Sequence, residues 1–395
     1  MSLRRISLLV IAVTGVAAAQ SPVPPQPQLP LATQTVWQMQ ESGTTAGLRG
    51  IDSVDGTVAW ASGTGGTVLK TTDGGAHWLK CAVPDAATDG ATLDFRGVQA
   101  WDAKTAIVMA SGTGEKSRLY KTNDGCRTWK LIFKNPDAPD GFFDSFLFPK
   151  VQNIPKENDG FGLLFGDQVA GGFALYETRD KGAQWNRVLK ESLNSRQKDS
   201  GAFAASNSCI SGLGGRNFGI VVSEGGESAM FRMAYLGGMW LDDPPAITPH
   251  FWGKVSLPIA KGNESSGPFS LAMISRLSPS TGGTFRFAVV VGGDYLKPIE
   301  SVGTAAWSSD GGSTWTASMT PPHGYRSSVQ WSESLKAWIT VGTNGSDISR
   351  DDGKTWQPLE DGNWNALSLP FVVGPGGRIA RLNEAALAPS PPPTR

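Results

Sequence analysis

The chain has 395 residues, enough for two average domains or one large all-β domain. It contains 49 Gly and 14 Trp, 18% of its residues are charged, and its formal net charge is zero. This charge balance argues against bulk attraction to nucleic acid or to an anionic membrane, and abundant glycine with little charge favours short strands joined by tight turns.

The N-terminus has the pattern of a secretory signal. Arg4 and Arg5 precede an apolar run, and Ala17–Ala19 provide a small-residue cleavage site. The run is too short for a stable membrane span, and an uncleaved N-terminal anchor is the alternative. We therefore expect residues 1–19 to be a signal peptide, residues 20–34 to be a Pro-rich tether, and the protein to be periplasmic or secreted.

An eight-residue turn recurs along the chain. It begins with Ser-x-Asp or Thr-x-Asp, usually continues with glycine, and ends in a tryptophan five residues after the aspartate. The aspartate can accept hydrogen bonds from following N–H groups, and glycine adopts positive φ without a Cβ clash. The five pairs are Asp73 and Trp78, Asp124 and Trp129, Asp180 and Trp185, Asp310 and Trp315, and Asp351 and Trp356.

The spacing of these turns predicts seven repeats. Met233–Trp240 keeps a glycine and the tryptophan but has Tyr235 in place of the aspartate, so we interpret it as a degenerate copy. Trp37 stands alone before the first full repeat. A period of several tens of residues is typical of repeat architectures.

Each repeat contains four short candidate strands. In the first repeat, alternating runs over 48–54, 58–62 and 67–71 precede the turn, and a fourth run starts at Trp78. This order is the signature of a β-propeller blade, and the chain shows no sustained helical periodicity.

The last repeat supplies only three strands. The segment Val36–Gln40 can provide the fourth and so close the ring by pairing the two ends of the chain. The predicted fold is an all-β, seven-bladed propeller of four-stranded antiparallel blades over residues 35–383, with a disordered tail over residues 384–395.

The cysteines do not form a disulfide framework, because there are three. Cys81 and Cys126 occupy similar levels of successive repeats, and a bridge between them is our first choice. The alternative is that these two and Cys209 are three small, partly buried residues.

The recurring turn resembles the Asp-box, or BNR repeat, of sialidases and many non-enzymatic propellers. The fuller blade, with Arg49-Gly50-Ile51 before the turn at Asp73, is similar to the Ycf48/HCF136 family. That resemblance implies an exported or lumenal seven-bladed propeller of the kind that assists photosystem II assembly. It also implies that the five aspartates and their tryptophans are structural, because the Asp-box lies at the outer rim.

A propeller binds ligands around its central channel, where the first strand of each blade begins. Alignment of the repeats places a set of basic, acidic and aromatic residues there: Arg49, Arg96, Phe143, Asp144, Phe203, Phe269, Tyr325 and Arg326. A second set follows the second strands: Asp167, Asp294 and Tyr295. The arginines suit a carboxylate, a sulfate or an acidic peptide, and the alternative is that each pairs with a neighbouring carboxylate such as Asp94 or Asp144.

The function that we expect is a non-catalytic binding or assembly factor, monomeric, that holds a protein segment or an acidic or carbohydrate ligand. The alternative is a sialidase-like glycoside hydrolase with Tyr295 or Tyr325 as nucleophile, but the Arg-Ile-Pro segment of sialidases is missing. With three His in the chain we expect no metal site and no cofactor.

Overall fold

The computed structural model describes residues 35–149, 160–188, 193, 200–213, 217–224, 226–233, 252–277 and 283–387. The signal peptide, the tether, most of the degenerate turn and the last eight residues of the tail lie outside these ranges. Within them the strands form seven antiparallel sheets, which are the blades of a propeller, and the helical segments are short 3-10 turns. The predicted seven-bladed all-β fold is therefore confirmed.

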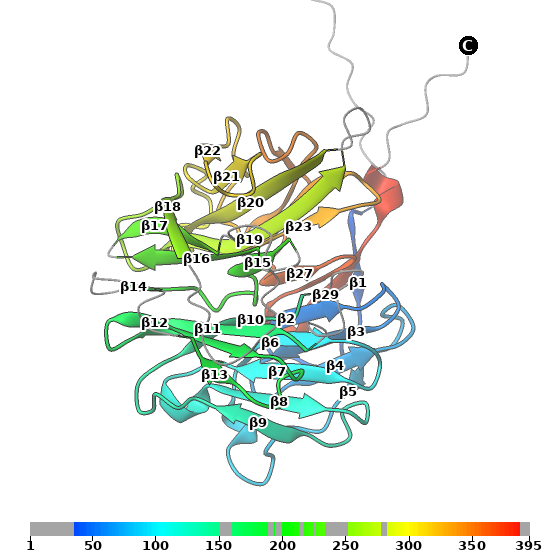
Figure 1. Ribbon diagram of the computed structural model, residues 1–395. Helices are drawn as coiled ribbons and strands as arrows, with labels where there is room; N and C mark the ends of the chain where they lie inside the picture. Colours follow the sequence, from blue (N-terminus) through cyan, green and yellow to red (C-terminus); the bar gives the residue numbers. More distant parts are fainter. Residues whose placement is uncertain are drawn as a thin grey trace, which may run out of the picture. The chain divides into compact units, whose positions relative to one another are not determined.

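Blades 1 to 3 each contain four consecutive strands, named from the inner to the outer edge (Figure 1). Blade 1 is β2 (Leu48–Ser53), β3 (Ala59–Gly63), β4 (Val68–Thr71) and β5 (Leu79–Lys80). Blade 2 is β6 (Phe95–Ala100), β7 (Ala106–Ala110), β8 (Arg118–Thr122) and β9 (Lys130–Lys134). Blade 3 is β10 (Phe143–Leu147), β11 (Gly162–Val169), β12 (Gly172–Thr178) and β13 (Asn186–Arg187).

Blade 4 differs because two short strands share its inner edge. It is β14 (Ser200–Gly201) and β15 (Ile210–Gly212), both paired with β16 (Phe218–Glu224), then β17 (Glu227–Met233) and β18 (Trp252–Ser256). Trp252 pairs with Met233, the last residue of the third strand. Trp252 therefore occupies the place at the start of the outer strand where the sequence pattern suggested Trp240.

Blades 5 to 7 complete the ring. Blade 5 is β19 (Ser266–Leu277), β20 (Thr284–Asp294), β21 (Ala305–Ser308) and β22 (Thr316–Ala317). Blade 6 is β23 (Ser328–Ser332), β24 (Ala337–Gly342), β25 (Gly345–Ser349) and β26 (Gln357–Pro358). Blade 7 is β27 (Ala366–Ser368), β28 (Phe371–Val373), β29 (Ile379–Leu382) and β1 (Trp37–Gln40).

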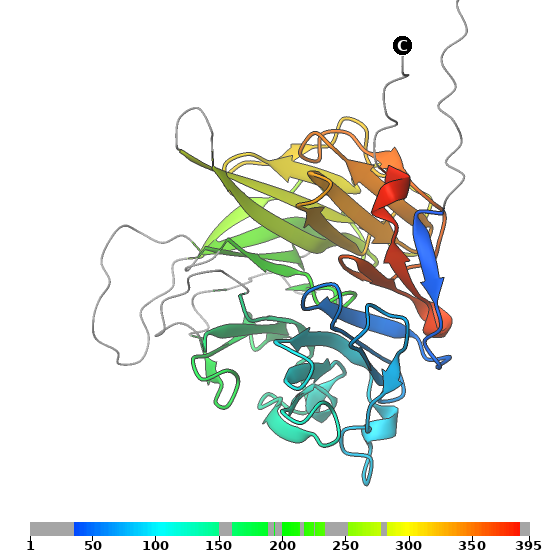
Figure 2. The ribbon, with the colours of Figure 1, turned by 90° about the vertical axis from the view of Figure 1, so that its right-hand side faces the viewer.

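The two ends of the propeller close the ring as predicted. β1 pairs antiparallel with β29, and Trp37 lies opposite Leu382 in the register. Figure 2 shows β1 (blue) beside β29 (red) in blade 7. The Trp37 indole donates a hydrogen bond to the Ser346 hydroxyl of blade 6 (2.9 Å) and packs against Trp364. The N-terminal strand thus covers an edge that would otherwise be unpaired.

Neighbouring blades are joined by cations on their third strands. In blade 1 the Lys70 ammonium lies over the Trp60 ring and donates to the carbonyls of Ala103 and Gly125 in blade 2. Lys121 of blade 2 reaches the Lys181 carbonyl of blade 3, and Arg381 of blade 7 reaches the Gly74 carbonyl of blade 1. Each cation satisfies a carbonyl in the turn of the next blade, so it fixes one blade against another.

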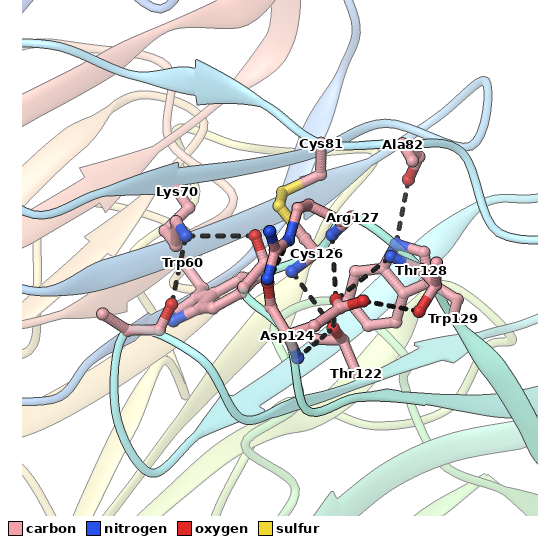
Figure 3. The surroundings of a disulfide bond; sticks show 12 residues. Trp60, Lys70, Cys81, Ala82, Thr122, Asp124, Cys126, Arg127, Thr128 and Trp129 are labelled. Carbon is pink, nitrogen blue, oxygen red and sulfur yellow. Dashed lines mark hydrogen bonds between the residues drawn. A yellow bond between two sulfur atoms is a disulfide. The ribbon is translucent and has the colours of Figure 1, made fainter.

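A disulfide links blades 1 and 2 at their outer edges (Figure 3). It joins Cys81, which follows β5, to Cys126, which lies in the turn after β8. Cys126 has a φ of 69°, at the position where the other turns have glycine. Cys209 is a free, buried thiol. The predicted pairing is therefore present in the structure.

The described part of the C-terminal segment packs against the propeller. Glu384–Leu387 form a 3-10 turn, and Ala386 and Leu387 pack against the core of blades 6 and 7.

Among the residues that the structure describes, no helix is long and apolar enough to cross a membrane.

Candidate functional site

A β-bulge at the start of the first strand positions the residues that face the mouth of the ring, which is the end of the central channel where the first strands begin. The register shifts between Leu48 and Gly50 in blade 1, and equivalent shifts occur in blades 2, 3 and 5. A bulge leaves one residue unpaired and redirects its side chain. The bulged residues are Arg49, Arg96, Asp144 and Phe269.

In blades 1 and 3 a glycine on the second strand lets the start of the first strand approach closely. A Cβ on Gly63 would lie 2.3 Å from the Gly47 carbonyl oxygen, and a Cβ on Gly166 would lie 2.2 Å from that of Phe142. A larger residue at these two positions would therefore push the start of the first strand away. Blade 2 forms the same bulge with Ala110 opposite Phe95. The apolar-Gly pattern of the second strands is the sequence signal of this approach.

Arg49 and Arg96 meet at a single carboxylate. The Asp94 Oδ2 atom lies 3.2 Å from Arg49 Nε and accepts a hydrogen bond from Arg96 Nε (2.8 Å). The side chains of Arg49 and Arg96 are 34% and 28% exposed. Burial lowers the pKa of Arg49, Asp94 opposes this effect, and Arg96 adds to it. Two guanidinium groups thus share one carboxylate at a partly open surface, which suits an added anionic group.

An aromatic cluster lies beside this basic pair. The Phe203 and Phe269 rings stack at 3.8 Å, and Phe269 contacts Tyr325 edge-on at 4.8 Å. Tyr295 lies 6.2 Å from Phe269 and is 46% exposed. Phe269 and Tyr325 are buried, so Tyr295 is the most accessible ring of these three, and burial raises the pKa of Tyr325.

Asp144 and Asp167 form an acid pair on neighbouring strands of blade 3, with Asp144 buried and Asp167 half-buried. Asp144 is 1% exposed, and its pKa is raised by burial and then by the neighbouring charge of Asp167. Asp167 accepts a hydrogen bond from the Ala202 amide (3.1 Å), and burial raises its pKa to about 6. Two carboxyl groups this close cannot both ionise easily, so burial and the charge of Asp167 together favour the protonated form of Asp144.

Arg326 lies away from the mouth surface, inside blade 6. Its side chain is fully buried, and its Nε donates to Asp347 Oδ2 (2.6 Å). One terminal nitrogen donates to Asn344 Oδ1 (2.5 Å) and to the Tyr325 carbonyl (2.6 Å), and the other contacts His323 Nδ1 (2.9 Å). The structure therefore does not bring Arg326 together with Arg49.

The position of Arg326 in its blade explains this burial. The glycine that ends the second strand marks equivalent residues, because its missing Cβ faces the backbone of Leu48 in blade 1 and that of Arg326 in blade 6. Ser327, one residue later, is therefore the counterpart of Arg49. A shift of one residue along a strand moves a side chain to the other face.

The other residues singled out from the sequence are also buried. Phe143 is 1% exposed and stacks on Phe133 in the core of blade 3. Asp294 is 7% exposed and accepts hydrogen bonds from the Ser265 hydroxyl and the Leu296 amide. Burial alone would raise the pKa of Asp294, but these hydrogen bonds lower it, which indicates a carboxylate that holds a loop.

The five aspartate turns share one hydrogen-bond pattern between the third and fourth strands. In blade 1 the Thr71 hydroxyl donates to Asp73 Oδ1 (2.8 Å) and accepts from the Gly75 amide (3.0 Å), and Asp73 Oδ1 accepts from the His77 amide (3.0 Å). The bond from the His77 amide is the main cause that holds the pKa of Asp73 at about 2. Trp78 then packs edge-on against Phe371 of blade 7. These bonds use the carboxylates within their turns, away from the first strands.

Sequence reasoning missed two features near these residues. Phe142 lies under the Arg96 guanidinium at 5.7 Å, and only the register of blade 3 places it there. The loop after β20 presents Leu296, Ile299 and Val302 to solvent. Their signal was the apolar spacing within that loop.

The fold defines a seven-bladed propeller, in which Arg49 and Arg96 share Asp94 at a partly exposed position. No family model matches the chain. The photosystem II assembly lipoprotein Ycf48 of Synechococcus sp. (strain CC9902) is 22% identical over 216 residues, which cover 53% of this chain and 56% of that protein. The chain thus spans about half the length of this curated relative.

Two solved Ycf48 structures have the same fold. One is YCF48 bound to a D1 peptide and the other is YCF48 from Cyanidioschyzon merolae. Each superimposes on 89% of this chain with a TM-score of 0.54 and 17% identity, and the match covers 97% and 100% of the two proteins. The predicted resemblance to the Ycf48-like propellers is confirmed.

Proposed function

We propose that this protein is a binding or assembly factor that holds an acidic segment of a protein partner at the mouth of the ring. The observation that carries the proposal is the pair Arg49 and Arg96, which share Asp94 and remain partly exposed beside an aromatic cluster. Arginine binds carboxylates in a fixed geometry, and aromatic rings provide contact area at low cost in entropy. A related propeller, YCF48, has been solved with a D1 peptide bound, which supports a polypeptide ligand.

The experiment is a double substitution, Arg49→Ala with Arg96→Ala. A display library of random 12-residue peptides is selected on the wild-type protein, and the enriched peptides are synthesised for titration. We expect acidic peptides to be enriched and the double variant to bind them at least about tenfold more weakly, with an unchanged midpoint of thermal unfolding. Unchanged affinity would place the ligand elsewhere, and an unfolded variant would mean that the arginines only staple blades 1 and 2.

Arg326 provides the matched contrast. Its guanidinium is hydrogen-bonded within blade 6, so Arg326→Ala leaves the buried Asp347 carboxylate with His323 but without its guanidinium partner. We expect that variant to lose stability first, whereas the mouth variant loses binding first.

We also propose that the protein is exported and acts as a monomer. The support is the charged, apolar and small-residue order of residues 1–19. Protein purified from the extracytoplasmic fraction should begin at Gln20, and sedimentation should give the mass of one chain. An intact N-terminus at Met1 would favour the anchor instead.

The glycoside hydrolase alternative remains a separate prediction. A tyrosine nucleophile is activated when its pKa falls, whereas burial raises the pKa of Tyr325. Aryl glycosides, including a sialoside, test the point: turnover that disappears in Tyr295→Phe or Tyr325→Phe would replace the binding proposal.

A further inference from the structure

The loop that follows β20 presents three aliphatic side chains to solvent. Leu296 is 71% exposed, Ile299 is 79% exposed and Val302 is 86% exposed, and they recur at every third residue. Single exposed aliphatic residues are common, but a run of them on one loop indicates a contact surface. We call residues 295–302 the blade 5 loop.

Hydrogen bonds hold this loop in one conformation. At its start, the Leu296 amide donates to Asp294 Oδ1 (3.0 Å) and the Lys297 amide donates to the Asp294 carbonyl (2.9 Å). The Glu300 amide donates to the Lys297 carbonyl (3.0 Å). The aliphatic side chains are therefore exposed on a loop whose backbone is already fixed, so a ligand meets them at little cost in entropy.

The blade 5 loop is continuous with the mouth surface. The Tyr325 amide donates to the Pro298 carbonyl (3.0 Å), which ties the middle of the loop to the aromatic cluster. Tyr295 begins the loop and contacts Phe269 of that cluster. An extended chain that places an acidic group at Arg49 and Arg96 can thus continue over the aromatic rings onto the aliphatic residues.

We propose that the blade 5 loop is a second subsite for the same partner, which it contacts through two or three apolar residues that adjoin the acidic group held at the mouth. This inference rests on the proposed function. The occupant is an extended polypeptide because the surface combines a basic end with an apolar end. Charge at one end and aliphatic contact at the other also fix the direction in which the segment lies.

The test compares one triple variant with one double variant in the titration of the selected acidic peptides. The first is Leu296→Ser, Ile299→Ser and Val302→Ser. The control is Leu277→Ser with Phe285→Ser. Leu277 is 76% exposed and Phe285 is 50% exposed, and both lie at the end of the β19–β20 hairpin opposite the blade 5 loop. Serine at these exposed sites leaves the core unchanged, and circular dichroism and thermal unfolding verify the fold.

We expect the loop variant to bind the peptides about tenfold more weakly and the control to bind as the wild type does. Enriched peptides should carry aliphatic or aromatic residues next to the acidic one, and their replacement by serine should abolish the difference between wild type and loop variant. Equal affinity of the loop variant and the wild type, with Arg49 and Arg96 still required, overturns the second subsite and leaves the proposed function intact. Failure to enrich any peptide that requires Arg49 and Arg96 contradicts the proposed function itself.

Two other occupants are outcomes of the same design. In both cases the affinity for the peptides would be unchanged in the loop variant. If the wild type floats with phosphatidylcholine vesicles and the loop variant does not, the loop contacts a lipid surface. If the wild type sediments as a dimer and the loop variant as a monomer, the loop contacts a second copy of the chain. Either result overturns the inference.

Discussion

At the scale of single residues, the hydroxyl and carboxylate of each turn complete a small hydrogen-bond cage. In blade 6 the Ser349 hydroxyl donates to Asp351 Oδ1 (2.9 Å), and the Thr355 amide and hydroxyl donate to the two carboxylate oxygens (2.9 and 2.6 Å). Asp351 lies beside Trp356, whose ring is buried between blades 5 and 6. The carboxylate thus fixes the turn that delivers the tryptophan.

We predict that Asp351→Ala destabilises the protein by about 1 kcal/mol or more, because backbone and hydroxyl donors lose their acceptor. Peptide binding at the mouth should not change. Urea unfolding followed by tryptophan fluorescence measures the stability, and Asp361→Ala, at an exposed position outside the turn, controls for loss of charge. An equal loss in both variants would argue against the cage.

The acid pair Asp144 and Asp167 predicts a distinctive dependence of stability on pH. The pKa of Asp167 in the folded state is about 6, above the usual value of 3.8, and the pKa of Asp144 is also raised. The folded protein therefore binds more protons than the unfolded chain between about pH 4 and pH 6, so this pair's contribution to stability is greatest below pH 4 and falls as the pH rises through 6.

Asp144→Asn should remove the part of this dependence that comes from Asp144 and leave the part that comes from Asp167, because burial still raises the pKa of Asp167. The asparagine amide does not titrate. The free energy of unfolding, measured at pH 5 and pH 8, should therefore fall less with pH in the variant than in the wild type. An equal or larger fall in the variant would contradict the assignment of a raised pKa to Asp144.

At the scale of elements, the disulfide joins two blades that are already in contact. Cys81 and Cys126 are 45 residues apart, so their bond restricts the unfolded chain, and reduction should cost up to about 4 kcal/mol. Guanidinium unfolding with and without a reductant gives the difference.

The turn of blade 2, in which Cys126 stands where the other turns have glycine, offers a control for that experiment. Cys126 has positive φ, which glycine adopts without strain. In a Cys81→Ser background, Cys126→Gly should therefore be about 1 kcal/mol more stable than Cys126→Ser. Equal stability of the two variants would mean that the turn tolerates a side chain there at no cost.

At the scale of the whole molecule, closure of the ring depends on one strand from the other end of the chain. β1 supplies the outer edge of blade 7 and places Trp37 against Trp364, and Glu360 of blade 6 accepts hydrogen bonds from the Val36 and Trp37 amides. Loss of β1 would expose the edge of β29 and the core beside that strand.

We predict that a chain beginning at Ser42 forms aggregates or oligomers and unfolds at a lower temperature. A chain beginning at Thr35 keeps β1 and is the matched control. Light scattering after gel filtration and a thermal melt distinguish the two. A monomeric Ser42 chain with the control's unfolding temperature would show that closure by β1 is dispensable.

The amino-acid sequence was sufficient to predict the number of blades, the turns between their outer strands and the strand that closes the ring. These features can be predicted because the turn sequences and the alternation of apolar and polar residues are local signals, and because both recur in each repeat. The degenerate repeat is the exception. Its sequence pattern favours Trp240 as the tryptophan before the outer strand, whereas the outer strand of blade 4 begins at Trp252.

The folded structure was needed to show which of the candidate side chains are accessible. Arg49 and Arg326 both begin a first strand in the sequence, yet Arg49 is partly exposed and Arg326 is buried in its blade. The difference is one residue of register at a bulge, which depends on how a glycine of the second strand packs against the first. Asp144 and Asp167 lie on neighbouring strands of blade 3, and blade 4 contacts Asp167 through the Ala202 amide, so the burial that raises their pKa values exists only in the folded protein.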